Sequence, residues 1–357
     1  MPDWRREMAE RTDSLDALAA RWPDFEVTGS MRRAAERYPF AATDHTLSLV
    51  EHAGPSDPVF FQCVPDAAEM ADDAGLLPDE LGEESRFAPL PGLIHRYPDR
   101  VVCIATTVCP TYCRHCTRKR LVGRPPAAAP DFDAHADYVR RHPGVRDVII
   151  SGGDPLTLPT GRLDEVVRRF RAIPSVAIIR IGSRAAVTLP SRIDDALCEM
   201  LERHHPVWLN TQFNHPREVT AASAAACDRL LRHGIPVGNQ AVLLRGVNDS
   251  PAVMEELCRA LLRIRVRPYY LLQCDPVAGV GHFRTPVARG IEIIEHLQRA
   301  VGGLGVPRLA LDAAGAGGKV PISPSHLIET KDGEVVLRSV EGQRVSYPDP
   351  RDCSGES

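Results

Sequence analysis

Lysine is nearly absent from this chain of 357 residues: only Lys119, Lys319 and Lys331 occur, and the other 40 basic residues are arginine. Long hydrophobic runs are absent too, since no stretch approaches the roughly 18 apolar residues needed to cross a bilayer. The first residues are charged and show no apolar segment of a signal peptide. These absences argue against a membrane protein, and we expect a cytoplasmic one.

The composition is that of a folded globular protein. Hydrophobic residues make up 43% of the chain and charged residues 25%, which excludes a disordered or collagen-like chain. The formal net charge of −4 argues against nucleic acid as the main partner. The length is sufficient for one large α/β domain or two smaller ones.

Three regions are expected. Residues 1–95 are mainly helical and form an N-terminal cap, residues 96–311 alternate between β-rich runs and helical patterns, and residues 312–357 form a C-terminal segment with a hairpin at 334–338 and 344–347. The β-rich runs are 101–105, 147–150, 176–181, 207–210, 236–243, 268–272 and 308–311. Such alternation predicts a parallel sheet closed into a partial barrel, with a doubly wound sheet as the alternative. No G-x-G-x-x-G follows the first strand, so a dinucleotide site is not indicated.

A cysteine cluster directly follows the first strand of the barrel. Cys109, Cys113 and Cys116 have C-x3-C-x2-C spacing. Three thiolates from one loop can hold three irons of a [4Fe–4S] cube and leave the fourth iron open to a chelating small molecule. Structural zinc is one alternative, but it would need a second cysteine pair, which is absent. Three buried apolar cysteines are the other alternative, which the neighbouring Arg114 and Arg118 disfavour.

Lys319 ends a glycine-rich stretch that follows the last β-rich run. A phosphate-binding P-loop would need glycine in place of Ala313 and serine or threonine in place of Val320, so that interpretation fails. A lysine on such a turn can instead bond to pyridoxal phosphate. A flexible surface loop with one solvated lysine remains the alternative from these residues alone.

Two further patterns lie beside the cysteines. Arg96 and Arg100 could clamp a phosphate group, whereas Lys119 and Arg120 are expected on a solvated charged surface. At the end of the second strand, Gly152, Gly153 and Asp154 form a motif whose glycines allow close backbone approach. Taken alone, this motif is also an ordinary turn.

The cysteine loop and the Gly-Gly motif resemble the radical S-adenosylmethionine superfamily. Over about residues 95–348 the chain closely resembles the lysine 2,3-aminomutase family. The matching stretches are 95–100, 109–121, 151–156, 210–216, 238–249, 265–275, 282–290 and 312–321. The resemblance implies an α/β fold, a partial (βα)6-type radical S-adenosylmethionine barrel with an N-terminal helical extension and a short C-terminal segment. It also implies three cofactors: a [4Fe–4S] cluster, S-adenosyl-L-methionine and pyridoxal 5′-phosphate.

The resemblance assigns roles to individual residues. Cys109, Cys113 and Cys116 would bind the cluster, and Lys319 would be the catalytic lysine that bonds to pyridoxal phosphate, with Arg96 and Arg100 on the phosphate group. Arg118 would bind the substrate's α-carboxylate, and Asp275 and Asp312 its distal ammonium group. Gly152, Gly153, Asp154, His215 and Gln240 would contact S-adenosylmethionine.

The implied enzyme is an isomerase that moves the α-amino group of a basic L-amino acid to the β-carbon through a 5′-deoxyadenosyl radical. Two acidic groups at the distal end of the pocket call for a cation, so lysine is favoured, arginine is the alternative and glutamate is disfavoured. The implied partners are a small-molecule substrate, a flavodoxin- or ferredoxin-like electron donor, and further copies of the chain in a dimer or tetramer.

Two departures from the family matter. Leu272 stands where the lysine enzymes carry tyrosine. Ser250 replaces an expected cysteine and the tail has only Cys353, so we expect no interfacial zinc.

Three other functions remain open: a relative that supplies β-lysine for a translation factor, a non-catalytic iron–sulfur or zinc-binding scaffold, and a radical enzyme with another outcome such as deamination.

Overall fold

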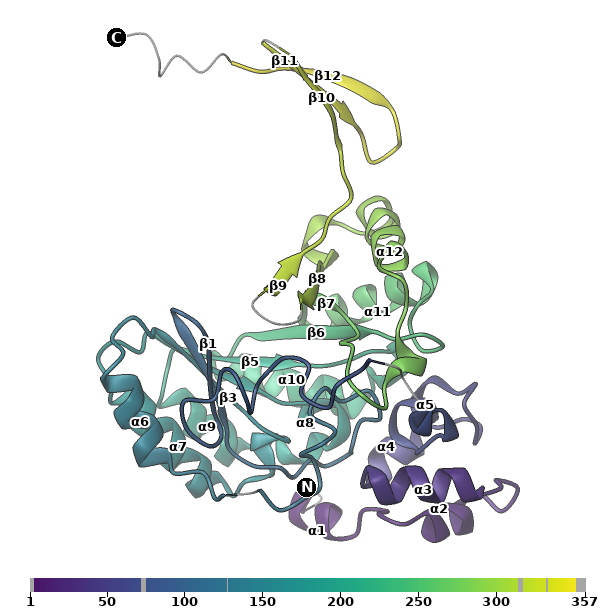
Figure 1. The fold of residues 1–357 in the computed structure, drawn as a ribbon, viewed down its shortest axis with the longest axis vertical. Coiled ribbons are helices and arrows are strands. Elements are labelled where there is room, and N and C mark those ends of the chain that lie inside the picture. The colour runs from purple at the N-terminus through teal and green to yellow at the C-terminus, as the bar shows by residue number, and fades with distance from the viewer. Residues whose placement is uncertain (1–2, 72–74, 127, 314–316, 332, 351–357) are drawn as a thin grey trace.

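A computed structural model describes residues 3–71, 75–126, 128–313, 317–331 and 333–350. Its centre is a nine-stranded sheet in which neighbouring strands follow the order of the chain, β1 to β9 (Figure 1). Strands β2 to β8 are all parallel, and β1 and β9 pair antiparallel at the two edges. The strands are β1 (Leu93–Tyr97), β2 (Arg100–Ile104), β3 (Asp147–Ser151), β4 (Ile178–Gly182), β5 (Val207–Thr211), β6 (Val237–Leu243), β7 (Arg267–Gln273), β8 (Arg308–Ala313) and β9 (Gly318–Pro321).

Helices connect successive parallel strands and cover one face of the sheet (Figure 1). The α-helices of the barrel are α6 (Phe132–Arg140), α7 (Thr160–Arg171), α8 (Ala185–Thr188), α9 (Asp195–Glu202), α10 (Ala221–Arg232), α11 (Pro251–Arg263) and α12 (Val287–Ala300). Short 3-10 turns complete the connections: η2 (Pro155–Thr157), η3 (Pro190–Arg192), η4 (Pro216–Glu218), η5 (Gly281–Phe283) and η6 (Gly303–Gly305).

The alternation of side chains along each strand decides which residues face the interior of the barrel. On β3, Val148 and Ile150 are fully buried in the core that the sheet forms with the helices. Because successive side chains point to opposite faces, Ile149 and Ser151 lie on the inner face, where they are half-buried. Polar residues at the carboxyl ends of the strands can therefore gather at one rim.

The N-terminal region packs as a helical layer against this rim. It contains α1 (Trp4–Ala9), α2 (Leu15–Arg21), α3 (Gly29–Arg37), α4 (Asp44–Ser48), α5 (Pro58–Cys63) and η1 (Ala67–Met70). Side-chain caps start α2, α3 and α4, where Ser14, Thr28 and Thr43 each accept a backbone N–H from three residues later. The layer has a small hydrophobic core of its own.

A buried ion-pair group joins this layer to the cysteine loop. Glu69 of η1 accepts from the Nη2 of Arg114 at 2.6 Å and from the Nζ of Lys119 at 2.7 Å. All three side chains are buried, and Arg114 also donates to the backbone carbonyls of Tyr38 and Pro39. The N-terminal layer therefore holds the loop that carries the cysteines.

The C-terminal strands β10 (Leu327–Lys331), β11 (Glu334–Arg338) and β12 (Arg344–Pro348) form a separate antiparallel sheet that extends away from the body (Figure 1). The expected hairpin is confirmed as β11 and β12, while β10 was not expected. In the described part of the chain, no helix is both long and apolar enough to cross a membrane.

The expected parallel strands are all present, and the partial barrel replaces the doubly wound alternative because neighbours follow chain order throughout the sheet. The expected boundary at 95/96 falls inside β1 and that at 311/312 falls inside β8, since both strands belong to the barrel sheet. The N-terminal region is helical, as expected.

Replacing Glu69 with glutamine should strongly destabilise the protein, because Arg114 and Lys119 would then be buried without their shared counter-ion. We expect the free energy of unfolding to fall by about 3–5 kcal/mol, measured by urea denaturation. The matched control is Glu51→Gln, which breaks an exposed pair with Arg217 and should cost less than about 1 kcal/mol. Equal effects of the two substitutions would contradict the role of the buried group.

Candidate active site

Ionisable side chains from distant parts of the chain meet at the carboxyl ends of the parallel strands. Arg118 belongs to the cysteine loop after β2, Asp275 follows β7, Asp312 lies on β8 and Lys319 on β9. Ser151 ends β3 beside Arg118. The structure thus brings together the residues expected to bind the substrate and the lysine expected to bond to a cofactor.

The register of the last two strands fixes the position of Lys319. Asp312 of β8 lies directly opposite Lys319 of β9, so both side chains project from the same face of the pair. The Lys319 Nζ donates to the Asp312 carboxylate at 2.6 Å and lies 5.6 Å from the centroid of the Tyr270 ring. The backbone N–H of Lys319 donates to the Tyr97 hydroxyl at 2.8 Å.

The two arginines expected on a phosphate group differ in how closely they approach Lys319. Arg96 on β1 donates to the Ala313 carbonyl at 2.8 Å and lies 3.7 Å from the Asp312 carboxylate. Arg100 on β2 stacks over the Tyr97 ring, with its guanidinium carbon 3.8 Å from the ring centroid. Arg100 also pairs with its neighbour Asp99 at 2.8 Å, so Arg96 is the arginine that contacts the Asp312 partner of Lys319, and Arg100 lies behind Tyr97.

Asp275 is a half-buried carboxyl whose pKa is raised. Burial raises its pKa to about 6, and the negative charge of Asp312 adds to the shift. A hydrogen bond from the Thr117 hydroxyl at 2.9 Å, and the charge of Lys319, oppose the shift in pKa. The two carboxylates expected to receive a cation therefore interact electrostatically in this site.

Arg118 has a partner that the sequence did not reveal. The Glu83 carboxylate accepts from the Nε and Nη2 of Arg118 at 2.8 and 2.7 Å, and the Nη1 of Arg118 lies 3.3 Å from the Ser151 hydroxyl. Glu83 comes from the segment between η1 and β1 and is 35 residues away in sequence. No motif marks such a pairing, so only the folded structure could find it.

The cysteine loop lies between the sheet and the N-terminal layer. Cys109, Cys113 and Cys116 carry free, half-buried thiols. Burial raises the pKa of Cys109 well above its ordinary value and that of Cys116 to about 11, and the proximity of the other cysteines adds to both shifts. The three sulfurs are thus neighbours, and iron would have to displace the protons of Cys109 and Cys116 on binding.

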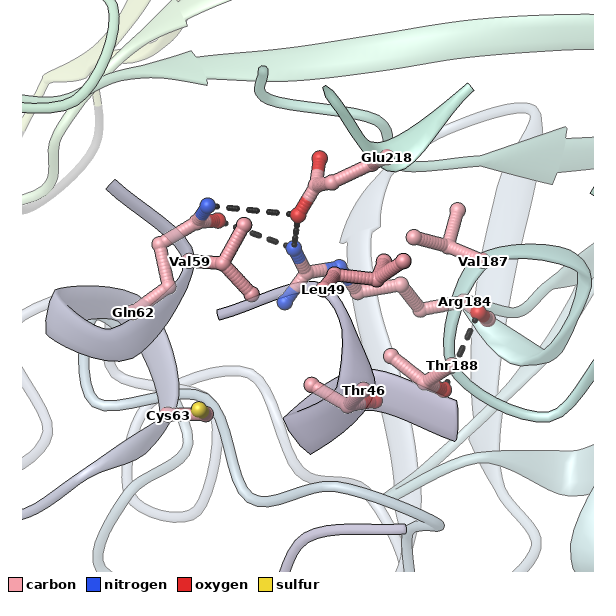
Figure 2. A pocket seen from close by; sticks show the side chains of 9 residues that line it. All are labelled: Thr46, Leu49, Val59, Gln62, Cys63, Arg184, Val187, Thr188 and Glu218. Carbon is pink, nitrogen blue, oxygen red and sulfur yellow. Dashed lines mark hydrogen bonds and ion pairs between the residues drawn. The ribbon is translucent and has the colours of Figure 1, made fainter. Parts of the chain in front are cut away.

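Arg184 is a second residue that sequence reasoning missed. It follows β4 and donates from its Nη1 to the Cys113 sulfur at 2.8 Å. Its Nη2 donates to Gln62 at 2.8 Å and to Glu218 at 2.6 Å in a buried polar pocket between α4, α5 and α8 (Figure 2). Arg184 therefore connects this pocket to the cysteine loop and places a positive charge beside the Cys113 sulfur.

The glycine motif after β3 packs against the start of the cysteine loop. A Cβ on Gly152 would lie 2.3 Å from the Thr106 carbonyl oxygen, and one on Gly153 would lie 2.4 Å from that of Val108. Asp154 is buried, and its carboxylate accepts from the Ser183 hydroxyl and from the backbone N–H of Arg184. The loops after β2, β3 and β4 are therefore in direct contact through the glycine motif and the hydrogen bonds of Asp154.

His215 lies in the loop after β5, and Gln240 lies on the neighbouring strand β6. His215 caps η4 by accepting the Arg217 N–H at 3.2 Å. Gln240 is half-buried on β6, opposite Tyr270 of β7. Because Ala241 and its alternate neighbours pack in the hydrophobic core, Gln240 faces the interior of the barrel.

The prediction of a solvated surface for Lys119 and Arg120 was wrong. Lys119 is 5% exposed, and its Nζ donates to the Gly279 carbonyl at 2.7 Å in addition to pairing with Glu69. The Arg120 side chain is 14% exposed and pairs with Asp79 and Glu84. Their acidic partners lie 36 or more residues away, so local sequence could not show that these charges are enclosed.

The donor sets suit the expected cofactors. Three thiols on one loop with a neighbouring guanidinium fit an iron–sulfur cluster, for which thiolates are the protein ligands. A lysine that pairs with Asp312 and lies near the Tyr270 ring, with Arg96 beside the same aspartate, fits pyridoxal phosphate, whose phosphate needs cations and whose carbonyl carbon needs an amine. Cys353 lies outside the described residues.

The chain is similar in sequence to known families of enzymes. A sequence model of the radical SAM superfamily matches residues 103–258, and one described as lysine-2,3-aminomutase matches residues 294–357. An L-lysine 2,3-aminomutase of Clostridium subterminale is 45% identical over 351 residues, covering 98% of this chain and 84% of that protein. The same enzyme of Bacillus subtilis is 43% identical over 98% of this chain and 74% of its own length. A glutamate 2,3-aminomutase of Clostridioides difficile is 38% identical over 89% of this chain and 76% of its own length.

Asp275 yields a prediction about stability and pH. Because its pKa in the folded protein is about 6 rather than 3.8, ionisation of Asp275 costs folding free energy at neutral pH. Asp275→Asn should raise the free energy of unfolding at pH 7.5 by on the order of 1–3 kcal/mol, since one pKa unit corresponds to about 1.4 kcal/mol. The gain should shrink as pH falls through 6 and vanish below pH 3.8, where wild type becomes protonated in both the folded and the unfolded state. A gain that is independent of pH between 4 and 8 would contradict this account.

Proposed function

The chain belongs to the lysine 2,3-aminomutase family of radical S-adenosylmethionine enzymes, and on this basis we propose that it moves the α-amino group of L-lysine to the β-carbon. It is an isomerase whose cofactors are a [4Fe–4S] cluster, S-adenosylmethionine and pyridoxal phosphate. The observation that carries the proposal is the meeting of Lys319, Asp312, Asp275 and Arg118 at one rim of the barrel, beside the cysteine loop. A non-catalytic scaffold would have no use for this arrangement.

We propose that Cys109, Cys113 and Cys116 bind the cluster and that Lys319 bonds to pyridoxal phosphate, with Arg96 and Arg100 on the phosphate. Bound together, S-adenosylmethionine and the cluster supply a carbon radical that can remove a hydrogen atom, and pyridoxal phosphate supplies a π-bond across which nitrogen can move. The contribution of the protein is to hold the reacting groups in contact and to keep water out.

The pocket supports a substrate with a carboxylate at one end and a cation at the other. Arg118 is proposed to bind the α-carboxylate, and Asp275 and Asp312 the distal ammonium. The ion pair of the Lys319 ammonium with Asp312 supports this, because it shows the same kind of contact that a substrate ammonium would make. Once Lys319 is engaged by the cofactor, Asp312 becomes available to the substrate.

Lysine is proposed over arginine and glutamate. A carboxylate pair attracts either basic side chain, so the charge alone does not separate lysine from arginine. The relatives reported above at 43% and 45% identity carry the name of the lysine enzyme, whereas the glutamate enzyme is less similar. The side-chain carboxylate of glutamate, its second carboxylate, would also meet two acidic residues, Asp275 and Asp312.

Gly152, Gly153, Asp154, His215 and Gln240 are proposed to contact S-adenosylmethionine. Gly152 and Gly153 support this through their place beside the start of the cysteine loop, and Gln240 through its inward position on β6. The Asp154 carboxylate already accepts hydrogen bonds from Ser183 and Arg184. Its side chain would therefore contribute by holding the loops after β3 and β4 in place around S-adenosylmethionine.

We also propose a cytoplasmic enzyme that draws one electron from a flavodoxin- or ferredoxin-like donor and acts as a homo-oligomer, a dimer or a tetramer. The apolar residues Leu327, Ile328 and Tyr347 on the projecting C-terminal sheet support contact with another chain, because each is about half exposed.

The direct test is product analysis under anaerobic conditions. The holoenzyme is given dithionite and S-adenosylmethionine together with lysine, arginine or glutamate, and products are identified by mass spectrometry after derivatisation. We expect a β-amino isomer from lysine alone. A β-amino isomer formed from arginine would show that arginine is also a substrate or is the substrate instead of lysine. Release of ammonia without an isomer would show that the enzyme is a deaminating enzyme and not an aminomutase.

Two variants should separate the cofactors. The Lys319→Ala variant should lose the absorbance of bound pyridoxal phosphate yet keep the wild-type iron content. Position 319 lies on β9 and not on the cysteine loop, so the substitution should leave the cluster site intact. Cys113→Ser should lose iron yet keep pyridoxal phosphate. Both should reduce turnover by more than about 1,000-fold, in the range expected when a group essential to catalysis is removed. Loss of both cofactors in either variant would contradict the assignment of separate sites.

A further inference from the structure

Arg118 presents two edges of its guanidinium group, and Glu83 occupies only one. The Glu83 carboxylate takes the side edge, formed by Nε and Nη2, at 2.8 and 2.7 Å. Such paired hydrogen bonds hold the planar group in one orientation, because the five N–H donors of arginine have a fixed fork geometry. The pair is largely enclosed, with side-chain exposures of 20% for Arg118 and 14% for Glu83.

The other edge of Arg118 is directed toward the rim of the barrel. Its Nη1 lies 3.3 Å from the hydroxyl of Ser151, which ends β3 on the inner face. The end edge, formed by Nη1 and Nη2, can therefore bind a second carboxylate while Glu83 keeps the side edge. An unrestrained arginine would instead sample many rotamers, and ordering them costs free energy on binding.

Glu83 is itself held in place by its neighbours. Its backbone N–H donates to the Asp79 carboxylate at 2.9 Å, which closes a turn in the segment before β1. The Nη2 of Arg120 lies 2.8 Å from Asp79 and 3.8 Å from Glu83. Arg120 thus offsets part of the negative charge that Glu83 would otherwise direct at an incoming carboxylate.

We propose that Glu83 is a positioning residue that orients Arg118 for the α-carboxylate of the substrate and so contributes to the preference for free amino acids. The inference rests on the proposed function, in which Arg118 binds that carboxylate. Glu83 acts only through Arg118 and does not touch the reacting atoms.

The test compares L-lysine with L-lysinamide, which lacks the carboxylate charge, in the reconstituted holoenzyme. In Glu83→Gln we expect the KM for lysine to rise about tenfold, equivalent to about 1.4 kcal/mol, with kcat within twofold of wild type. The inhibition constant of lysinamide, measured against lysine, should stay within twofold. Glu83→Asp, which keeps the charge but shortens the side chain, should give a smaller rise in KM. The matched control is Glu84→Gln, since Glu84 pairs with Arg120 and not with Arg118.

The outcomes separate the two proposals. A KM for lysine that falls in Glu83→Gln would show that Glu83 competes with the substrate, and an unchanged KM in both Glu83 variants would show that it has no role; either overturns the inference. If Arg118→Lys keeps the wild-type preference for lysine over lysinamide, the assignment of Arg118 itself fails. Iron content and pyridoxal phosphate absorbance, measured on each variant, confirm that the site has assembled.

Discussion

The ion pair between Lys319 and Asp312 is the contact on which the site depends, and the pairing register of β8 and β9 determines it. A shift of one residue would turn the Lys319 side chain to the opposite face of the sheet, away from the rim. The antiparallel edge strand therefore does more than extend the sheet, because it returns the chain so that a lysine from the C-terminal segment meets residues of β1 and β7. Tyr97 secures the backbone of Lys319 from the other end of the sheet.

A second constraint is the burial of charge around the cysteine loop. Arg114, Lys119 and Arg184 are all enclosed, and each has a carboxylate partner, Glu69 or Glu218. Partners of this kind are needed because an unpaired buried charge is strongly destabilising. Glu69, Gln62 and the Tyr38 carbonyl all come from the N-terminal region. That region thus forms one wall of the cysteine site in addition to capping the barrel.

Much of the architecture could be predicted because its signals are local. Alternating β-rich and helical runs identified the parallel strands, and cysteine spacing identified the loop. The edge strands β1 and β9 were not predicted. Each is short and pairs with only one neighbouring strand, so it has no clear pattern of its own in the sequence. Glu83 and Arg184 were missed for a related reason: their partners Arg118 and Cys113 lie 35 and 71 residues away. The burial of Lys119 was misjudged because its surroundings come from three separate segments.

The scarcity of lysine makes the central claim directly measurable. Sodium borohydride fixes pyridoxal phosphate onto the amine that holds it, and peptide mass spectrometry of the digested holoenzyme then locates the label among Lys119, Lys319 and Lys331. The account predicts one label per chain, on Lys319. A label on Lys119 or Lys331, or a holoenzyme with no labelled lysine, would contradict the assignment of the β8–β9 rim as the active site.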